Sequence, residues 1–155
     1  MLFLLGSLLL AAAPPATQPF DVAAHKTLLT AHAVGAQVYE CKAAAGGALQ
    51  WTFREPIASL IVDGKTVGRH YAGPHWALDD GSIVQGKVLE TAPGATPGDI
   101  AQLKLSVVDR QGSGALAQAT LVYRLRTHGG TLSGACTDAG ALRAVAYSAD
   151  YLFAR

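Results

Sequence analysis

The sequence contains few charged residues and no clusters of one sign. Charged residues make up 15% of the 155-residue chain, and twelve basic residues nearly balance eleven acidic ones, for a formal net charge of +1. They are scattered, so the chain lacks the positive surface that binds nucleic acid or an anionic membrane. Because 50% of the residues are hydrophobic, the chain can bury a core, and its length suits a single domain.

Several familiar catalytic motifs are also missing. The sequence has no P-loop, no dinucleotide-binding glycine fingerprint, no His-Glu-x-x-His pair and no Gly-x-Ser-x-Gly elbow. It has no paired cysteines with zinc-site spacing. These absences disfavour the common enzyme classes, although a triad assembled from distant positions stays possible. We therefore lean towards a protein that is not an enzyme.

The N-terminus is the most apolar part of the chain. Residues 1–13 form a run of about a dozen apolar residues, shorter than the roughly 20 that span a bilayer, and end in Ala11-Ala12-Ala13 before two prolines. This pattern predicts a signal peptide cleaved after Ala13, although no Lys or Arg precedes the run. A buried N-terminal helix is the alternative. We expect a secreted or periplasmic protein with no transmembrane span in the mature chain.

Only two cysteines are present, Cys41 and Cys136. In an exported chain, two cysteines predict one disulfide bond. The alternative is a catalytic thiol, which an oxidising compartment and an available partner both disfavour. The bond would close a loop that contains most of the domain.

Short apolar and alternating segments separated by turn residues predict an all-β fold. We expect residues 14–34 to form a lead-in and the first strand, and residues 35–155 a single β-rich domain. Alanines permit a helix up to Ala33, Glu55-Pro56 should end a strand, and Asp63-Gly64 is typical of a type I′ hairpin. Strands are predicted at residues 27–42, 49–54, 59–62, 66–71, 75–78, 82–91, 100–108, 119–127 and 142–153, with residues 109–114 as a loop. The fold class is an antiparallel β-sandwich or barrel with one disulfide.

Residues 68–82, GRHYAGPHWALDDGS, concentrate the polar and aromatic side chains. His70 and His75 could simply hydrogen-bond backbone groups at turns, with Asp79 and Asp80 building a turn. Alternatively, His70, His75 and Asp79 could bind a divalent cation. Elsewhere, Arg124 and Arg126 fall on one face of a predicted strand and could hold an anion, or could lie on a solvated face.

The ordered set of motifs resembles the exported family known as domain of unknown function 3455. The resemblance rests on residues 35–41 (GAQVYEC), 51–53 (WTF), 67–76 (VGRHYAGPHW), 80–82 (DGS), 124–130 (RLRTHGG), Cys136 and 145–153 (VAYSADYLF). It implies a secreted, β-rich domain with one disulfide, and no reaction. His75 stands where other members often have a small polar residue, which weakens a metal site that requires both histidines.

Three functional hypotheses follow, of which the third is a purely structural or interaction domain with no small-molecule pocket. The leading one is a non-catalytic binding domain whose cleft, lined by Tyr39, Trp51, His70, Trp76 and Tyr151, takes a small molecule, a sugar or an envelope partner. The second is a metal-dependent enzyme that uses His70 with nearby His or Asp residues. The first requires no cofactor, and the second requires a divalent metal.

Overall fold

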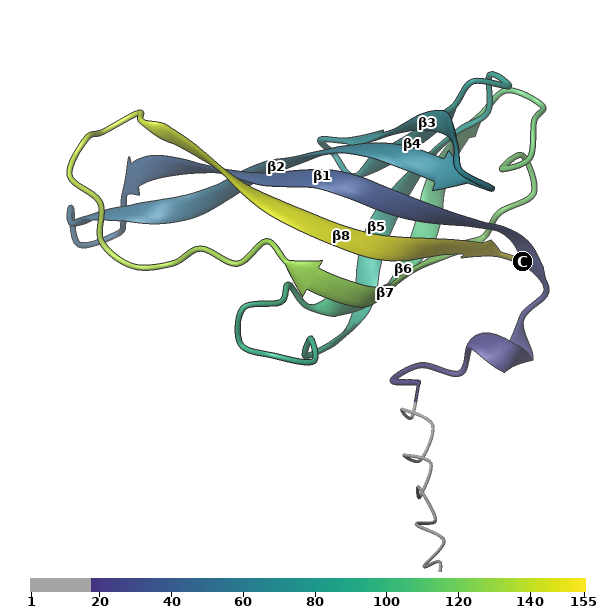
Figure 1. Cartoon of the computed structure of the whole chain (residues 1–155), viewed down its shortest axis with the longest axis horizontal. Coiled ribbons are helices and arrows are strands. Elements are labelled where there is room, and N and C mark those ends of the chain that lie inside the picture. Colours follow the sequence, from purple (N-terminus) through teal and green to yellow (C-terminus); the bar gives the residue numbers. More distant parts are fainter. Residues whose placement is uncertain (1–17) are drawn as a thin grey trace, which may run out of the picture.

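A computed structural model describes residues 18–155, which form a closed barrel of eight antiparallel strands (Figure 1). Each strand pairs with its neighbour in sequence, and β8 pairs with β1, so the sheet has no free edge. The expected all-β antiparallel fold is confirmed, and the closure makes it a barrel. The strands are β1 (Thr27–Ala43), β2 (Leu49–Val62), β3 (Lys65–Tyr71), β4 (His75–Leu78), β5 (Ile83–Ala92), β6 (Gln102–Gln111), β7 (Leu121–Gly129) and β8 (Leu142–Ala154), preceded by a 3-10 helix η1 (Val22–Ala24).

The alternation of side chains along each strand decides what fills the barrel. On β8, Tyr147, Ala149, Tyr151 and Phe153 are all buried, while the residues between them are partly exposed. The same alternation places small residues inward on β1 and β2, which lets the walls approach closely. Period-two patterning therefore sorts this sequence into an apolar interior and a more polar exterior.

Two boundaries predicted from the sequence are wrong. Pro56 does not end a strand: β2 continues to Val62, and Pro56 pairs with Gln37 of β1. Because β3 pairs with β2 only from Ala58 onwards, Pro56 lies where the second side of β2 has no ladder, and a strand tolerates proline there. Likewise, β6 extends to Gln111 because residues 109–111 pair with β5, so the loop begins at Gly112.

The local turn chemistry and the character of β1 agree with the sequence. Asp63 and Gly64 have φ angles of 49° and 74°, the positive values that a type I′ turn needs, and they join β2 to β3. β1 is a strand along its whole length, although its alanines would permit a helix up to Ala33. Pairing with β2 on one side and β8 on the other overrides that local preference.

One end of the barrel is filled by the loop between β6 and β7. Leu116 and Ala119 of this loop are completely buried and belong to the main hydrophobic core. The backbone N–H of Ala115 donates to the Asp80 carboxylate, and that of Leu116 donates to the Ser82 hydroxyl. The β4–β5 turn therefore holds this loop, residues 112–120, as a plug in one end of the barrel.

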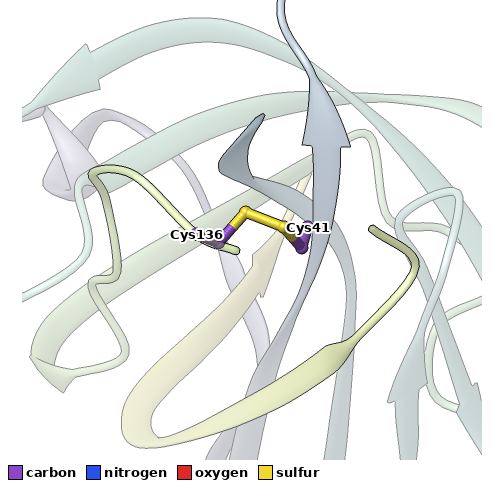
Figure 2. The surroundings of a disulfide bond; sticks show 2 residues. All are labelled: Cys41 and Cys136. Atoms are coloured by element: carbon purple, nitrogen blue, oxygen red, sulfur yellow. A yellow bond between two sulfur atoms is a disulfide. The ribbon is translucent and has the colours of Figure 1, made fainter. Parts of the chain in front are cut away.

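The opposite end carries the disulfide. Strands β1, β2 and β8 are the longest and reach past the short strands β3 and β4, as Figure 1 shows. The Cys41–Cys136 bond joins β1 to the β7–β8 loop, as predicted, and Figure 2 shows the two residues on these segments. The same loop also pairs with β2, because Trp51 N–H donates to the Gly134 carbonyl. The loop is thus fastened to the projecting β1–β2 ribbon.

The expected signal peptide, residues 1–13, lies outside the described residues. Within residues 18–155, no helix has the length and apolar character needed to cross a membrane.

Removing the disulfide should lower stability without changing the fold. The bond spans a sequence separation of 95 residues, so the Cys41→Ala/Cys136→Ala variant should lose about 4–5 kcal/mol of unfolding free energy, because the unfolded chain regains conformational freedom. Urea titration of the oxidised protein and of the variant measures this difference, and far-UV circular dichroism serves as the control for an intact β-sheet. A loss below about 1 kcal/mol would show that the cross-link contributes little.

Candidate functional site

A cavity of about 590 Å³ lies inside the barrel, between the buried core and the end that carries the disulfide. Residues of all eight strands line it, together with residues of the β3–β4, β5–β6 and β7–β8 loops. Volumes of this size are typical of sites for small molecules. The lining residues are Gln37, Tyr39, Phe53, Arg54, Pro56, His70, Gly73, Pro74, Trp76, Val88, Pro97, Asp99, Ile100, Ala101, Leu103, Leu105, Arg124, Thr131 and Tyr151.

Three aromatic side chains in mutual contact form the innermost wall. The β3–β4 hairpin pairs His70 directly with Trp76, and their rings stack at 4.6 Å with an interplanar angle of 8°. Tyr151 of β8 contacts both, with ring centroids 4.9 Å from His70 and 5.3 Å from Trp76. All three are buried, so they belong to the core and to the cavity wall at once.

Gly86 of β5 makes room for the Trp76 ring. A Cβ atom at position 86 would lie 3.0 Å from one indole carbon and 3.2 Å from a methyl carbon of Leu105. Any larger residue would crowd the indole ring and the Leu105 side chain. The ring position therefore depends on a glycine in the strand that pairs with β4.

Burial keeps His70 neutral. Its Nδ1 lies 2.8 Å from the His75 carbonyl, which can only accept, so Nδ1 donates and carries the proton. Loss of solvation lowers the pKa of His70 from 6.5 to about 3; the hydrogen bond to His75 opposes this, and the Arg124 charge adds to it. At neutral pH the side chain lining the cavity thus has Nε2 available as an acceptor.

Two tyrosines on β8 continue the buried polar surface. The hydroxyl oxygens of Tyr147 and Tyr151 lie 3.4 Å apart. Burial raises the pKa of both phenols, and the nearby Arg124 charge opposes part of the rise. Both tyrosines therefore remain protonated and can donate a hydrogen bond at physiological pH.

Three charged residues line the cavity, and they differ in their surroundings. Arg54 pairs with Glu55 at 3.2 Å and is half-exposed. Asp99 accepts hydrogen bonds from the N–H groups of Gly129 and Thr96 and from the Thr96 hydroxyl, which lower its pKa. Arg124 donates its Nε–H to the Ala101 carbonyl at 3.0 Å, and no Asp or Glu among residues 18–155 pairs with it.

The outer part of the cavity is aromatic on one side. Tyr39 of β1 and Phe53 of β2 are paired and meet edge to face, with ring centroids 5.8 Å apart. Tyr39 donates its hydroxyl to the Gly130 carbonyl at 2.7 Å, which fixes its ring. Phe53 is half-exposed, so an apolar surface meets solvent at the cavity's edge.

The structure brings together four of the five residues expected to line a cleft. Tyr39, His70, Trp76 and Tyr151 all line the cavity, whereas Trp51 does not. Trp51 pairs with Cys41 two residues beyond the Tyr39–Phe53 pair, and the Arg143 guanidinium lies 5.1 Å from its ring centroid. It therefore sits further out on the ribbon than the cavity extends.

The residues proposed as metal ligands serve other contacts. His75 Nδ1 lies 2.7 Å from the Ala72 carbonyl, and its ring stacks on Tyr71 at 5.1 Å. Asp79 lines a different hollow from His70. Residues 18–155 hold no group of three or more His, Cys, Asp or Glu side chains that could bind a metal ion.

The geometry fits the interpretation that His70, His75 and Asp80 form hydrogen bonds at turns. His70 and His75 both bond backbone carbonyls within the hairpin. Asp80 accepts hydrogen bonds from the backbone N–H and the hydroxyl of Ser82, at 2.9 and 2.6 Å. These bonds and the one from Ala115 lower the pKa of Asp80. Its role in this structure is to build the turn and anchor the plug.

Arg124 and Arg126 do not share a face. Arg126 has a φ of 47° at a bulge in β7, and this backbone change directs its side chain to the outer surface, where it pairs with Asp150 at 2.5 Å. Arg124 pairs with Tyr151 and Leu103 and so shares their inward face. Alternation in the sequence could not reveal the bulge that separates them.

Sequence reasoning missed several lining residues. Strand alternation already marks Leu103 and Leu105 as inward, so that signal could have placed them in the interior. By contrast, Pro97, Asp99 and Thr131 lie on loops, and nothing in their local sequence indicates which way the loops fold.

The fold and the cavity define an all-β barrel with an internal hollow. The chain belongs to the family described as Protein of unknown function (DUF3455), whose model matches residues 22–64 and 61–155. Comparison with curated proteins and with solved structures gave no match.

Stability should fall in mild acid because His70 resists protonation when folded. In the unfolded chain its pKa returns to 6.5, so between that pH and about 3 the unfolded state binds a proton that the folded state excludes. The resulting loss is about 1.4 kcal/mol per pH unit below pH 6.5. Above pH 6.5 His70 is unprotonated in both the folded and the unfolded state, so protonation of this residue no longer lowers the stability.

Urea unfolding of wild type and His70→Phe at about pH 7 and pH 5 measures the effect. The stability of wild type relative to the variant should drop by about 2 kcal/mol between the two values. Phenylalanine keeps an aromatic ring against Trp76 but cannot titrate, which makes it the matched comparison. An unchanged difference would mean that folded His70 takes up its proton normally.

Proposed function

We propose that this protein is an exported, non-catalytic binding domain that holds a small, largely apolar molecule in the barrel cavity. The observation that carries the proposal is the cavity of about 590 Å³, lined mainly by apolar and aromatic side chains with a few polar groups. This combination is the usual composition of small-molecule sites.

The cavity chemistry favours binding over proton transfer. A general base is most effective when its pKa lies near the working pH, whereas the pKa of His70 is lowered to about 3. Its Nδ1 is also committed to the His75 carbonyl. Both cysteines form the disulfide, so the chain has no free thiol nucleophile.

Export is the second part of the proposal. It is supported by the apolar segment at residues 1–13 with its Ala11-Ala12-Ala13 ending and by the Cys41–Cys136 bond, since such bonds persist in oxidising compartments. A ligand or partner in the periplasm or outside the cell follows from that location. An envelope component that inserts a small apolar group into the cavity would fit as well as a free molecule.

A bulky substitution in the cavity wall should weaken binding of an apolar probe. N-phenyl-1-naphthylamine, a neutral aromatic dye that fluoresces in apolar surroundings, should bind wild type in a 1:1 ratio. Val88→Trp adds bulk to the cavity wall. It should weaken binding of the dye about tenfold or more, because the added side chain occupies space in which a ring of the dye would otherwise be buried.

Val34→Trp is the matched control. Val34 and Val88 are similarly exposed, at 49% and 46%, but Val34 is not among the residues that line the cavity. The control should bind the dye like wild type, as fluorescence titration would measure. Equal weakening by both substitutions, or no saturable binding to wild type, would overturn the proposal.

A further inference from the structure

The unpaired guanidinium of Arg124 is the cavity feature that identifies a ligand class. Arg124 lies on β7 between Leu103 of β6 and Tyr151 of β8, each of which pairs with it directly and lines the cavity. It is only partly exposed. A partly buried cation with no counter-ion is costly, and an anion at the same place removes that cost.

The hydrogen bonding of Arg124 orients its guanidinium and uses only part of its donors. The Nε–H donates to the Ala101 carbonyl, and a side-chain hydrogen bond joins Arg124 to the Tyr151 hydroxyl, which leaves the remaining N–H groups for a ligand. Two parallel N–H donors in one plane match the oxygens of a carboxylate. Arginine also keeps its charge at any physiological pH.

The other charged groups at the cavity do not neutralise Arg124. The Asp99 carboxylate is held by Gly129 and Thr96, and no ion pair joins it to Arg124. Arg54 already has Glu55. The neutral His70 adds no charge of its own, and the Arg124 charge contributes to the low pKa of that imidazole.

A hydroxyl next to Arg124 points the same way. Tyr151 lines the cavity, remains protonated and can donate. A donor beside the guanidinium suits a ligand that brings oxygen atoms.

We propose that the ligand is an amphipathic organic anion, with an aromatic or aliphatic body against His70, Trp76 and Leu105 and a carboxylate paired to Arg124. This inference rests on the proposed binding function and adds the class of ligand to it. The stacked rings would contact the body of the molecule, and the anionic group would sit at the β6–β7–β8 side of the cavity.

The test compares two probes with the same naphthyl body, the anion 1-naphthylacetate and the neutral amide 1-naphthylacetamide. The full oxidised protein should bind the acetate at least about tenfold more tightly, because a charge-assisted hydrogen bond is stronger than a neutral one. Calorimetric titration, or displacement of N-phenyl-1-naphthylamine, measures both affinities. The ratio of the two affinities is measured on the wild-type protein alone.

Variants then assign the preference to one residue. Arg124→Met should reduce the acetate-to-amide ratio to about one, and Arg124→Lys should retain part of it. Arg126→Met should leave the ratio unchanged, because Arg126 pairs with Asp150 on the outer surface and does not line the cavity. A preference that survives Arg124→Met, or that disappears in Arg126→Met, would overturn the role given to Arg124.

The possible results separate this inference from the proposed function. Equal affinity of wild type for acetate and amide would overturn the anionic ligand class and leave the apolar cavity function standing. Failure of wild type to bind either compound or the neutral dye would overturn both.

Discussion

Pairing of β8 with β1 is the constraint on which the other features depend. Thirteen positions of β1, from Thr27 to Glu40, have partners on β8, so the last strand completes the sheet that the first begins. Closure forces every strand to present alternate residues to one enclosed interior. Because that interior is filled at one end by the core and the β6–β7 plug, a hollow remains at the other end. Cavity, plug and aromatic wall are consequences of one closed ladder.

Residues 68–82 contribute side chains to both ends of the barrel interior. His70 and Trp76 stack across the β3–β4 hairpin and form the inner wall of the cavity. Asp80 and Ser82, a few residues later, hold the plug through Ala115 and Leu116. This segment, for which a metal site was the alternative to turns, thus connects the filled and the hollow halves of the barrel. Its buried imidazole is neutral and offers an aromatic face and an acceptor to the cavity.

Much of the fold could be predicted from the sequence because its signals are local. Asp63-Gly64 specifies its own turn, and alternation on β8 marks Tyr147, Tyr151 and Phe153 as inward. The two cysteines allowed one pairing, which is the one found. Pro56 misled the prediction because its tolerance depends on how far β3 extends beside β2, a property of the neighbouring strand.

The cavity was less predictable for the same reason. Sequence alternation gives the face of a strand on which Trp51 or Tyr39 lies, but the height at which neighbouring strands end decides whether that residue meets the cavity. Trp51 lies on the same face of β2 as Phe53, yet it is beyond the end of the cavity. A bulge that no sequence motif indicates turns Arg126 outward, so that of these two arginines only Arg124 faces the interior. Long-range pairing therefore determined which residues line the cavity.

The most direct test of the account is where a bound molecule sits. Methyl NMR spectra recorded during titration with N-phenyl-1-naphthylamine would report this for the whole protein. The account predicts that the methyl signals of Leu103 and Leu105 shift, since both line the cavity, while those of Val34 and Val108 on the exposed surface stay in place. Shifts confined to the outer residues would show that the dye binds outside the barrel and would contradict the account.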